Sequence, residues 1–466
     1  MKAKNDLLAS LAAFGQERLL AFWDDLDQEQ RELLVDDIDG IDFRRVADLY
    51  KRRDEEQDYG ELARRMTPPP AFRLEAADNR VTPEEARRRG VEALRAGHVG
   101  VILVAGGQGT RLGFDHPKGM YPIGPISQKS LFRIHIEKIV ASSRRHGAPI
   151  PLYLMTSPAT RAETESYLAH RGRFGLPEED LKPFCQATMP AVDADTGSVL
   201  LAEPHRVASS PDGHGGTLAA LAGHGCLDDM RQRGLRHLFY LQVDNPLANV
   251  CSPESIGYHL ICGSEMSTQV VAKQTASDRV GNVVQVDGRL HVIEYIHWDD
   301  VIEQQPDAAD PKKFWAGSIA VHVFDRAFLE RMADRDDVLP FHLSDKKKVN
   351  YVDPSGELVQ PEKGNAIKFE RFIFDLMPFA DDAIVVEVDA HRDFGPLKNA
   401  AGAERDTPDT VKAQMVAVHR EWLRQAGAEV ADGVPVEISP LFALDAAELA
   451  EKIPAGTRIS EPEYFH

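Results

Sequence analysis

Short apolar runs alternate with amphipathic stretches through the middle of the chain, from about residue 99 to residue 400. Runs typical of buried strands lie at 99–105, 150–157, 235–244, 267–273 and 317–324, and stretches of helical periodicity at 130–145 and 160–170. Residues 283–295 read as a hairpin, because Asp287-Gly288 is a strong turn signal. Strands that alternate with helices predict an α/β fold with a Rossmann-like, mostly parallel mixed sheet, covered on both faces.

The two ends of the chain carry different patterns. Leucines recur at helical spacing through residues 5–66, opposite acidic positions, and predict amphipathic helices. The run TPPP at 67–70 interrupts this pattern. The C-terminal part is rich in Ala, Asp and Glu, with one helix expected near 409–426. We therefore expect an N-terminal helical region (1–90), an α/β domain (91–400) and a small C-terminal region or lobe (401–466).

Composition and charge narrow the possible partners. Hydrophobic residues make up 43% and charged residues 27% of the chain, which is ordinary for a protein with a sizeable buried core. The formal net charge is −20, from 74 acidic against 54 basic residues, and it disfavours nucleic acid and anionic membranes as partners. A local group of lysines and backbone N–H groups can still bind a small phosphorylated ligand in such a protein.

Cysteine usage and the absence of targeting signals indicate a cytoplasmic location. The four cysteines form no CxxC pair, so neither a zinc cluster nor a disulfide framework is predicted. The apolar run near the N-terminus is broken at residues 15–18 by GQER, unlike a secretory signal peptide. No stretch of about 18 uncharged apolar residues predicts a membrane span. The sequence assigns no oligomeric state.

The most informative feature is the glycine-rich loop after the first predicted strand, LVAGGQGTRLGFDHPK at 103–118. Glycines such as Gly106 and Gly107 allow the main chain to approach a ligand, so that successive N–H groups converge on an anion. Arg111 and Lys118 add cationic donors for phosphate oxygens. The loop therefore predicts a phosphate-binding site.

Three alternatives compete for this loop. A Walker A loop needs GxxxxGK[ST], and no Lys-Ser or Lys-Thr stands at that position. A dinucleotide fingerprint needs GxGxxG and an acid after the second strand, but the glycines at 107, 109 and 113 are spaced one residue too widely and the second strand ends in Thr-Ser. A purely structural glycine turn is the third alternative, which Arg111, Pro117 and Lys118 disfavour.

Two further segments suggest ligand contacts, each with a simpler structural alternative. Asp244 ends an apolar strand, where a carboxylate can hold Mg²⁺ against a triphosphate; it could equally cap the following Asn-Pro turn. The segment SPDGHGGT at 210–217 leads into an Ala- and Leu-rich helix and suits backbone contacts to a base or phosphate; it could also be only a tight loop.

These segments together resemble a known family. LVAGGQGTRLGFDHPKGM is similar to the signature loop of the eukaryotic-type UDP-sugar pyrophosphorylases, and most closely to their UDP-N-acetylhexosamine branch. SSPDGHGGTLAAL, YLQVDNPL, NAIKFERFIFDLMPFA, FGPLKNA and VEISPL follow in that family's order. The resemblance covers nearly the whole chain. It implies the nucleotide-diphospho-sugar transferase type of fold, with residues 91–400 as the nucleotidyltransferase catalytic domain.

The resemblance also implies an activity and the residues that support it. The enzyme would be a uridylyltransferase that takes UTP and a sugar 1-phosphate and gives a UDP-sugar and pyrophosphate, with Mg²⁺ as cofactor. Catalytic roles fall to Arg111, Lys118 and Lys368; nucleotide binding to Gly106, Gly107, Gln186, Gly213 and Asp244; sugar binding to His214, Gly281, Glu294 and Ser318; and the metal to Asp244. Catalysis of this reaction relies mostly on positioning and on neutralising phosphate charge.

The identity of the sugar depends on two departures from the UDP-N-acetylhexosamine branch. That branch carries Asn where this chain has Ser318 and where it has His214. The resulting PDGHGG segment is similar to the UDP-glucose and broad-specificity branches. The full-length resemblance favours N-acetylglucosamine 1-phosphate, with a UDP-glucose or broad-specificity enzyme as the alternative.

Two alternatives come from other functional classes. A non-catalytic nucleotide-sugar binding protein would keep the fold without turnover, but this chain retains Arg111, Lys118, Asp244 and Lys368. A nucleotide-dependent oxidoreductase is opposed by the loop spacing and by the missing ribose-binding acid.

Overall fold

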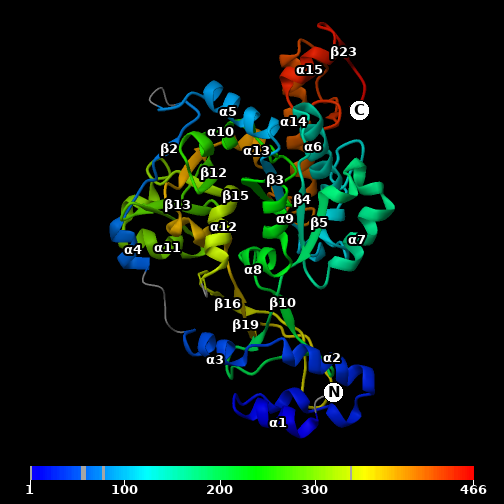
Figure 1. Cartoon of the computed structure of the whole chain (residues 1–466), viewed down its shortest axis with the longest axis vertical. Helices are drawn as coiled ribbons and strands as arrows, with labels where there is room; N and C mark the ends of the chain where they lie inside the picture. Colours follow the sequence, from blue (N-terminus) through cyan, green and yellow to red (C-terminus); the bar gives the residue numbers. More distant parts are fainter. Residues whose placement is uncertain (1–2, 54–58, 76–78, 336–337) are drawn as a thin grey trace. The chain divides into compact units, whose positions relative to one another are not determined.

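The computed structural model of the protein describes residues 3–53, 59–75, 79–335 and 338–466 (Figure 1). The chain divides into two compact units, each built from three separate stretches. Unit 1 comprises Met1–Asp58, Gln186–Gly216 and Leu339–Ile373, and unit 2 comprises Tyr59–Cys185, Thr217–Val338 and Phe374–His466. These two compact units differ from the three consecutive regions that the sequence pattern suggests. The division into three regions stays a prediction.

An 11-stranded sheet forms the centre of unit 2, with the main order β2-β20-β12-β15-β11-β3-β4-β5. In addition, β13 pairs with β15, and both β14 and β1 pair with β13. These strands are β1 (Met66–Thr67), β2 (Ala71–Phe72), β3 (Val99–Val104), β4 (Leu152–Thr156), β5 (Leu181–Cys185), β11 (His237–Gln242), β12 (Met266–Ala272), β13 (Gly281–Val286), β14 (Arg289–Ile293), β15 (Ala316–Asp325) and β20 (Ile384–Glu387). Along the main order only β15 runs antiparallel to its neighbours, β11 and β12. The predicted mostly parallel mixed sheet is confirmed.

The central strands form where the sequence supplies continuous apolar runs. Every residue of β4 is buried, as are most residues of β3 and β11, which is expected for parallel strands covered on both faces. Val104 at the end of β3 lies opposite Gln242 of β11 and Met155 of β4. The loops that follow these strands therefore leave the sheet side by side at its carboxyl edge, where ligands bind in open α/β sheets.

Helices of unit 2 connect these strands: α4 (Tyr59–Arg65), α5 (Pro83–Arg95), α6 (Leu131–His146), α7 (Arg161–His170), α8 (Gly216–Gly223), α9 (Cys226–Gln232), α10 (Pro253–Ile261), α11 (Trp298–Gln304), α12 (Arg326–Ala333) and α13 (Ala390–Asp393). Helix α6 shows why the sequence folds this way locally. The Ser130 hydroxyl caps its first turn by accepting from the Arg133 amide at 3.2 Å, and Gly147 ends it in the left-handed conformation (φ 70°). One face of α6 is buried in the core of the unit.

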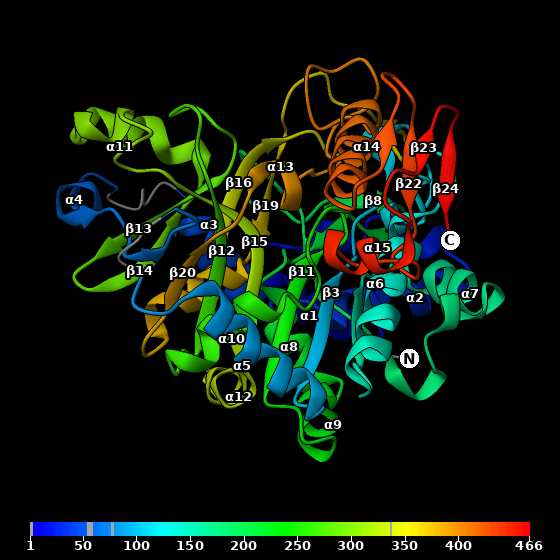
Figure 2. The same cartoon turned by 90° about the horizontal axis from the view of Figure 1, so that it is seen from above.

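The C-terminal segment is part of unit 2 and has an apolar cluster of its own. It contains α14 (Pro408–Gln425), α15 (Ala446–Lys452) and the strands β21 (Glu429–Val430), β22 (Val436–Ile438), β23 (Arg458–Ile459) and β24 (Glu463–Phe465). Leu423, Val436, Leu449 and Ile459 are buried together in this cluster. Figure 2 shows α14 beside β22, and β22 beside its parallel partner β24. The predicted helix near 409–426 is confirmed.

Unit 1 combines the N-terminal helices with strands from two later stretches. It contains α1 (Lys4–Ala12), α2 (Gln28–Asp39), α3 (Phe43–Lys51), β6 (Thr188–Pro190), β7 (Val192–Asp193), β8 (Leu201–Glu203), β9 (Arg206–Val207), β10 (Ser209–Pro211), β16 (His342–Lys347), β17 (Tyr351–Val352), β18 (Leu358–Val359) and β19 (Ala366–Glu370). Leu11 and Leu34 of the helices share an apolar cluster with Ile367 and Phe369 of β19. The N-terminal helices therefore cover a small sheet that the sequence pattern alone does not predict.

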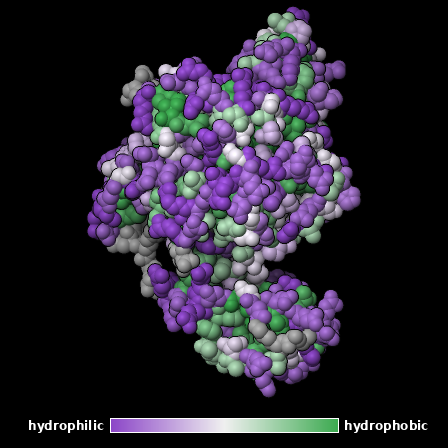
Figure 3. Space-filling model, viewed as in Figure 1, coloured by the Kyte–Doolittle hydropathy of each residue, from purple (hydrophilic) through white to green (hydrophobic). Residues whose placement is uncertain are grey.

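The surface is polar where the core is apolar. The face drawn in Figure 3 is predominantly hydrophilic, with hydrophobic residues scattered among charged ones. Among the residues that the structure describes, no helix combines the length and the apolar character needed to cross a membrane.

Candidate active site

The loop after β3 carries the predicted phosphate-binding glycines. The Lys118 amide donates to the carbonyl oxygen of Gly107 at 3.1 Å, so the loop closes on itself. The hydroxyl of Ser157, directly after β4, donates to the carbonyl oxygen of Gly106 at 2.7 Å. Gly107 is exposed, and a Cβ at that position would meet no atom within 4 Å. The loop backbone is therefore fixed on the protein side and open toward solvent, as an anion-binding loop must be.

The two cations of the loop have different surroundings. Arg111 lies in a short 3-10 helix (η3, Thr110–Leu112) and is exposed. Lys118 begins the next one (η4, Lys118–Met120), and only 17% of its side chain is exposed. Its Nζ donates to the Oδ2 atom of Asp244 at 3.2 Å. Lys118 is thus held in place by the protein, whereas Arg111 extends into solvent.

Asp244 stands at the carboxyl end of β11, next to the glycine loop. Burial alone would raise the pKa of Asp244, but the positive charges of Lys118 and Lys398 outweigh burial and lower that pKa below its ordinary value. The carboxylate is therefore ionised at neutral pH. The structure brings together Asp244 and Lys118, which are far apart in the sequence and were assigned to the same ligand.

Lys398 is a candidate that the sequence reasoning missed. The Leu397 amide donates to the carbonyl oxygen of Asp244 at 2.8 Å, which holds this segment at the end of β11. The charge of Lys398 contributes to the lowered pKa of Asp244. The available signal was the FGPLKNA segment, in which Lys398 is the one cation.

Asn245, next to Asp244, fixes the same segment from the other side. Its Oδ1 accepts from the amides of Leu247 at 3.3 Å and Gly395 at 3.0 Å, and its Nδ2 donates to the carbonyl oxygen of Asp393 at 2.8 Å. Asn245 is buried, so these bonds are sheltered from water. The side chain that sequence reasoning treated as part of a turn thus joins the end of β11 to residues 393–395.

A magnesium ion fits the chemistry of Asp244. Among the residues that the structure describes, no three or more His, Cys, Asp or Glu side chains are grouped so that they could hold a metal ion. Mg²⁺ does not need such a group, because it commonly binds one or two carboxylates and completes its shell with water and substrate phosphates. The ionised carboxylate of Asp244, 16% exposed beside the glycine loop, is a group of this chemistry.

Three of the predicted sugar-binding residues lie together in unit 2. Gly281 of β13 pairs with Ser318 of β15, and Glu294 directly follows β14. A Cβ added at Gly281 would lie 3.3 Å from Oε1 of Glu294 and 3.9 Å from Cβ of Ser318. Ala320 has φ 55°, a left-handed conformation that is unfavourable for a residue with a side chain, and its amide donates to Oγ of Ser318 at 3.4 Å.

A cavity of about 390 Å³ adjoins this group. Its lining comes from residues 276–279, which precede Gly281 in the sequence, from residues 295, 296, 298 and 299, which follow Glu294, and from Arg405. A cavity of this size is adequate for a small ligand. Sequence reasoning did not assign residues 276–279 or Arg405, because nothing in their local pattern separates them from an ordinary loop.

The PDGHGG loop of unit 1 is held by hydrogen bonds and an ion pair to Arg371. The buried Asp212 forms an ion pair with the partly exposed Arg371, and the Arg371 amide donates to the carbonyl oxygen of Asp212 at 2.8 Å. The Gly215 amide in turn donates to the carbonyl oxygen of Arg371 at 2.7 Å. Gly213 has φ 81°, and a Cβ there would lie 2.4 Å from the Arg371 carbonyl oxygen, so only glycine fits.

Two other predicted residues join this loop through short connections. Lys368 lies in β19, which ends one residue before Arg371. Gln186 is buried, and the next residue, Ala187, accepts from the Asp212 amide at 3.2 Å through its carbonyl oxygen. Unit 1 therefore gathers Gln186, the PDGHGG loop and Lys368 around the Asp212–Arg371 pair.

His214 is oriented by the segment that follows Arg371. The Ile373 amide donates to Nδ1 of His214 at 3.2 Å, and the imidazole stacks on Phe372 with ring centroids 5.3 Å apart. Because a backbone N–H can only donate, Nδ1 must be the unprotonated nitrogen. The proton of the imidazole is therefore on Nε2, which makes that atom a hydrogen-bond donor.

The predicted residues are thus divided between the two units. Unit 2 holds Gly106, Gly107, Arg111, Lys118, Asp244, Gly281, Glu294 and Ser318; unit 1 holds Gln186, Gly213, His214 and Lys368. Within unit 2, the glycine loop and Asp244 form an arrangement of the kind expected for binding phosphate. The group of Gly281, Glu294 and Ser318 forms an arrangement of the kind expected for binding a polar ligand.

Comparison with known proteins matches the chain over most of its length. The family described as UTP–glucose-1-phosphate uridylyltransferase matches residues 42–422. The human UDP-N-acetylhexosamine pyrophosphorylase-like protein 1 is 36% identical over 447 residues, covering 93% of this chain and 88% of that protein. The UDP-N-acetylglucosamine pyrophosphorylase of Saccharomyces cerevisiae is 34% identical over 441 residues, covering 91% of this chain and 92% of the yeast protein.

Among solved structures, the uridine diphosphate N-acetylglucosamine pyrophosphorylase from Trypanosoma brucei in complex with an inhibitor is similar to this chain. It superposes with a TM-score of 0.81 at 26% identity, covering 99% of this chain and 98% of that one. The resemblance read from the sequence and the predicted fold type are both confirmed.

Proposed function

Because the chain belongs to the UTP–glucose-1-phosphate uridylyltransferase family, we propose that it makes UDP-N-acetylglucosamine and pyrophosphate from UTP and N-acetylglucosamine 1-phosphate. The observation that carries the proposal is the pair of Lys118 and Asp244 beside the open glycine loop. A strand end that carries an ionised carboxylate, with a cation held against it and an exposed glycine loop beside it, suits a nucleoside triphosphate.

The reaction is an in-line displacement at the α-phosphorus of UTP. A phosphate oxygen of the sugar 1-phosphate forms the new bond to that phosphorus, and the bond to the bridging oxygen of the β-phosphate breaks. Pyrophosphate leaves with the electron pair of the broken bond. No protein atom forms a bond to the α-phosphorus in this displacement, so the residues act by binding, by orientation and by neutralising phosphate charge.

Lys118 is the residue best placed to act on the phosphates. Its ammonium group donates to Oδ2 of Asp244 at 3.2 Å. A bound phosphate offers a second anionic partner to the same ammonium group, which has three donors. Arg111 and Lys398 supply two further cations, from η3 and from the segment beside Asp244. Lys368 of unit 1 is proposed to bind phosphate as well, which rests on the family resemblance.

Asp244 is proposed to hold Mg²⁺ through one carboxylate oxygen. The ion would supply positive charge shared between the phosphates when it is bound. The contribution of the chain is to keep Asp244 ionised and fixed, through Lys118, Lys398 and the hydrogen bonds of Asn245.

The base and sugar contacts are proposed for separate groups. Gln186 carries a carboxamide that matches the donor and acceptor edge of uracil, and Gly213 presents backbone beside it. His214 offers an Nε2–H donor, since its Nδ1 accepts from the Ile373 amide. Gly281, Glu294 and Ser318 would contact the sugar, with Glu294 accepting from hydroxyl groups.

A UDP-glucose or broad-specificity enzyme is the second candidate, favoured by His214 and Ser318. Pyrophosphate release would be measured with UTP and, separately, the 1-phosphates of N-acetylglucosamine, N-acetylgalactosamine, glucose and galactose. We expect N-acetylglucosamine 1-phosphate to give the highest kcat/KM. A preference for glucose 1-phosphate would overturn the sugar assignment alone, and no release with any of the four would overturn the enzymatic function.

The proposed location is the cytoplasm. None of Cys185, Cys226, Cys251 and Cys262, which all lie in the described part of the chain, forms a disulfide, as expected in a reducing compartment.

A further inference from the structure

The segment that follows the phosphate loop contains a compact turn, residues 121–131, that leads from Lys118 into α6. Its ends are joined, because the Leu131 amide donates to the carbonyl oxygen of Tyr121 at 3.1 Å and Pro122 bridges Ser130. Within it, the amide of Ile123 donates to the carbonyl oxygen of Lys129 at 2.9 Å. This turn was not assigned a role by the sequence motifs.

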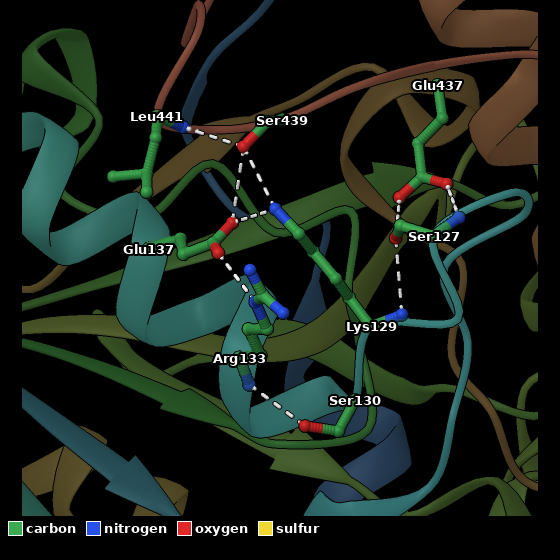
Figure 4. A network of polar contacts seen from close by, with 8 residues as sticks. All are labelled: Ser127, Lys129, Ser130, Arg133, Glu137, Glu437, Ser439 and Leu441. Atoms are coloured by element: carbon green, nitrogen blue, oxygen red, sulfur yellow. Dashed lines mark hydrogen bonds and ion pairs between the residues drawn. The ribbon is translucent and has the colours of Figure 1, made fainter. Parts of the chain in front are cut away.

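The tip of this turn is occupied by a carboxylate from the C-terminal segment. Oε2 of Glu437 accepts from the amides of Ile126 and Ser127, each at 2.7 Å. Oε1 accepts from the Ser127 hydroxyl at 2.5 Å, and Figure 4 shows the two contacts of Ser127 with this carboxylate. Glu437 lies in β22 and is 3% exposed. Successive N–H groups that converge on one carboxylate form the same kind of anion cradle that proteins use for phosphate.

The turn has little freedom to adopt another shape around this carboxylate. Gln128 has φ 54°, a conformation that is unfavourable for a residue with a side chain. A Cβ at Gly124 would lie 2.7 Å from the Lys129 amide nitrogen and 2.9 Å from Oε1 of Glu437. Without an acceptor at the tip, the part-buried amides of Ile126 and Ser127 would lose their hydrogen bonds to the buried Glu437 carboxylate, which costs stability.

A second set of contacts ties the end of the turn to the same C-terminal segment. The Lys129 ammonium group pairs with Glu137 of α6 and donates to the hydroxyl of Ser439 at 2.9 Å (Figure 4). Arg133 donates to the other oxygen of Glu137 at 2.8 Å. Lys129 and Glu137 are both buried, so the pair holds its geometry in a low-dielectric setting.

The turn is mechanically continuous with Lys118. The Tyr121 amide donates to the carbonyl oxygen of Lys118 at 3.0 Å. Between them, Gly119 lies against the ring of Phe132 so closely that a Cβ would be 2.3 Å from it. A shift of the turn therefore moves the backbone that carries Lys118, and Lys118 places its ammonium group on Asp244.

We propose that Glu437 is a positioning residue for the phosphate loop: its carboxylate fills the cradle of Ile126 and Ser127 and thereby sets the position of Lys118. The C-terminal segment is then part of the catalytic apparatus, although it supplies no group to the substrate. The expected effect of Glu437 on the kinetics rests on the proposed function. The effect of Glu437 on the backbone of the phosphate loop does not depend on that function.

The test compares two replacements of Glu437 with matched controls. Glu437→Met removes all three acceptor contacts at similar size. Glu437→Gln keeps an oxygen for the two amides and an NH₂ that can donate to the Ser127 hydroxyl. We expect the KM for UTP to rise about tenfold or more in Glu437→Met and to stay within about threefold in Glu437→Gln. The KM for the sugar 1-phosphate should change less than that for UTP. Glu429→Met, an exposed carboxylate of β21 that pairs with Arg458, should match the wild type.

Backbone hydrogen exchange supplies the readout that does not need turnover. In Glu437→Met, amides of residues 118–121 should exchange faster, along with those of Ile126 and Ser127, while Glu437→Gln restores their protection. Unchanged exchange at 118–121 in Glu437→Met, with a KM for UTP within twofold of the wild type, would overturn the inference. If the wild type itself releases no pyrophosphate, the proposed function fails. Hydrogen exchange of the amides at 118–121 then tests by itself whether Glu437 positions the backbone that carries Lys118.

A milder variant covers the case in which Glu437→Met does not fold. Ser127→Ala removes one of the three contacts from the loop side and leaves the C-terminal segment intact. We expect it to raise the KM for UTP by about two- to fivefold and to increase exchange at 118–121. Wild-type values for both in folded Ser127→Ala protein would then overturn the inference.

Discussion

Nζ of Lys118 lies 3.2 Å from Oδ2 of Asp244, which joins the end of the glycine loop to the end of β11. The pair exists because β3 and β11 are parallel neighbours in register, so that the segments following them leave the sheet at the same edge. It places one cation and one ionised carboxylate beside the glycine loop, in which Gly107 is exposed.

Replacement of Lys118 by Met should remove the cation that the structure holds in place. We expect kcat/KM to fall by about 10²- to 10³-fold, the usual loss when one fixed electrostatic contact to a transition state is removed. The fold should survive, because the side chain is at the carboxyl edge of the sheet rather than in its core. Pyrophosphate release and thermal unfolding would be measured together. Lys313→Met, which removes an exposed lysine paired with Asp307, serves as the control. Full turnover in folded Lys118→Met protein would contradict the assignment.

Asp244→Asn keeps the size of the side chain and removes its charge. We expect the concentration of Mg²⁺ needed for half-maximal activity to rise at least tenfold, because a neutral amide is a weaker ligand for a hard cation. Activity would be titrated with MgCl₂ at saturating UTP. An unchanged Mg²⁺ requirement would show that Asp244 is not a ligand of the ion, whatever its effect on kcat.

Asp393 gives the protein a predicted pH dependence of stability. Burial, and then the nearby charge of Asp389, raise the pKa of Asp393 to about 7, against the opposing charges of Lys138 and Arg392. An acid with a raised pKa holds its proton more tightly in the folded state than in the unfolded chain. The folded state therefore loses stability as pH rises from about 4 to about 7, at about 1.4 kcal/mol for each pKa unit of difference.

This pH dependence can be isolated with Asp393→Asn, which cannot ionise. Urea unfolding would be followed at pH 5 and pH 8 for the wild type and the variant. We expect Asp393→Asn to be more stable than the wild type at pH 8 by on the order of 4 kcal/mol, with a smaller difference at pH 5. Equal differences at the two pH values would contradict the raised pKa.

The ion pair of Asp212 and Arg371 should be important for the stability of unit 1. Burial raises the pKa of Asp212, although Arg371 opposes the shift by its charge and its hydrogen bond. Arg371→Met would leave this carboxyl group buried without its cation, and removing one partner of such a pair typically costs about 3–5 kcal/mol. We expect a lower unfolding midpoint in urea. The double variant Asp212→Asn, Arg371→Met should recover part of the loss, and no recovery would argue against a direct pairing energy.

Sugar preference should respond to the two positions that depart from the UDP-N-acetylhexosamine branch. We expect the double variant His214→Asn, Ser318→Asn to shift the ratio of kcat/KM toward N-acetylglucosamine 1-phosphate over glucose 1-phosphate by about tenfold, the scale of one or two hydrogen bonds. The ratio would be measured with both substrates at one UTP concentration. A ratio unchanged within twofold would remove these residues from sugar discrimination.

Much of the sheet could be predicted because its strands are continuous apolar runs of the right length. The runs at 99–105, 150–157 and 235–244 became β3, β4 and β11, and the Asp287-Gly288 turn joins β13 to β14. Their order within the sheet could not be predicted, because an apolar run that is buried on both faces carries no information about its neighbours. The antiparallel placement of β15, which carries Ser318, is of this kind.

The parts of the site that escaped prediction are pairs between distant segments. Arg371 shows no local signal, yet its backbone and side chain shape the PDGHGG loop. Glu437 stood in a segment recognised only as part of the family pattern, and its contact with Ile126 and Ser127 depends on how the C-terminal segment packs. Lys118 was identified as a cation of the glycine-rich loop and Asp244 as the carboxylate at the end of an apolar strand, so each has its own sequence signal.

The most direct measurement is the product of the reaction itself. Purified protein would be mixed with UTP, N-acetylglucosamine 1-phosphate and MgCl₂, and the phosphorus-containing products followed by ³¹P NMR, with Lys118→Met in parallel. We expect UDP-N-acetylglucosamine and pyrophosphate to appear in equal amounts, and much more slowly with the variant. Unchanged UTP, or UDP with inorganic phosphate and no UDP-sugar, would contradict the proposed uridylyl transfer.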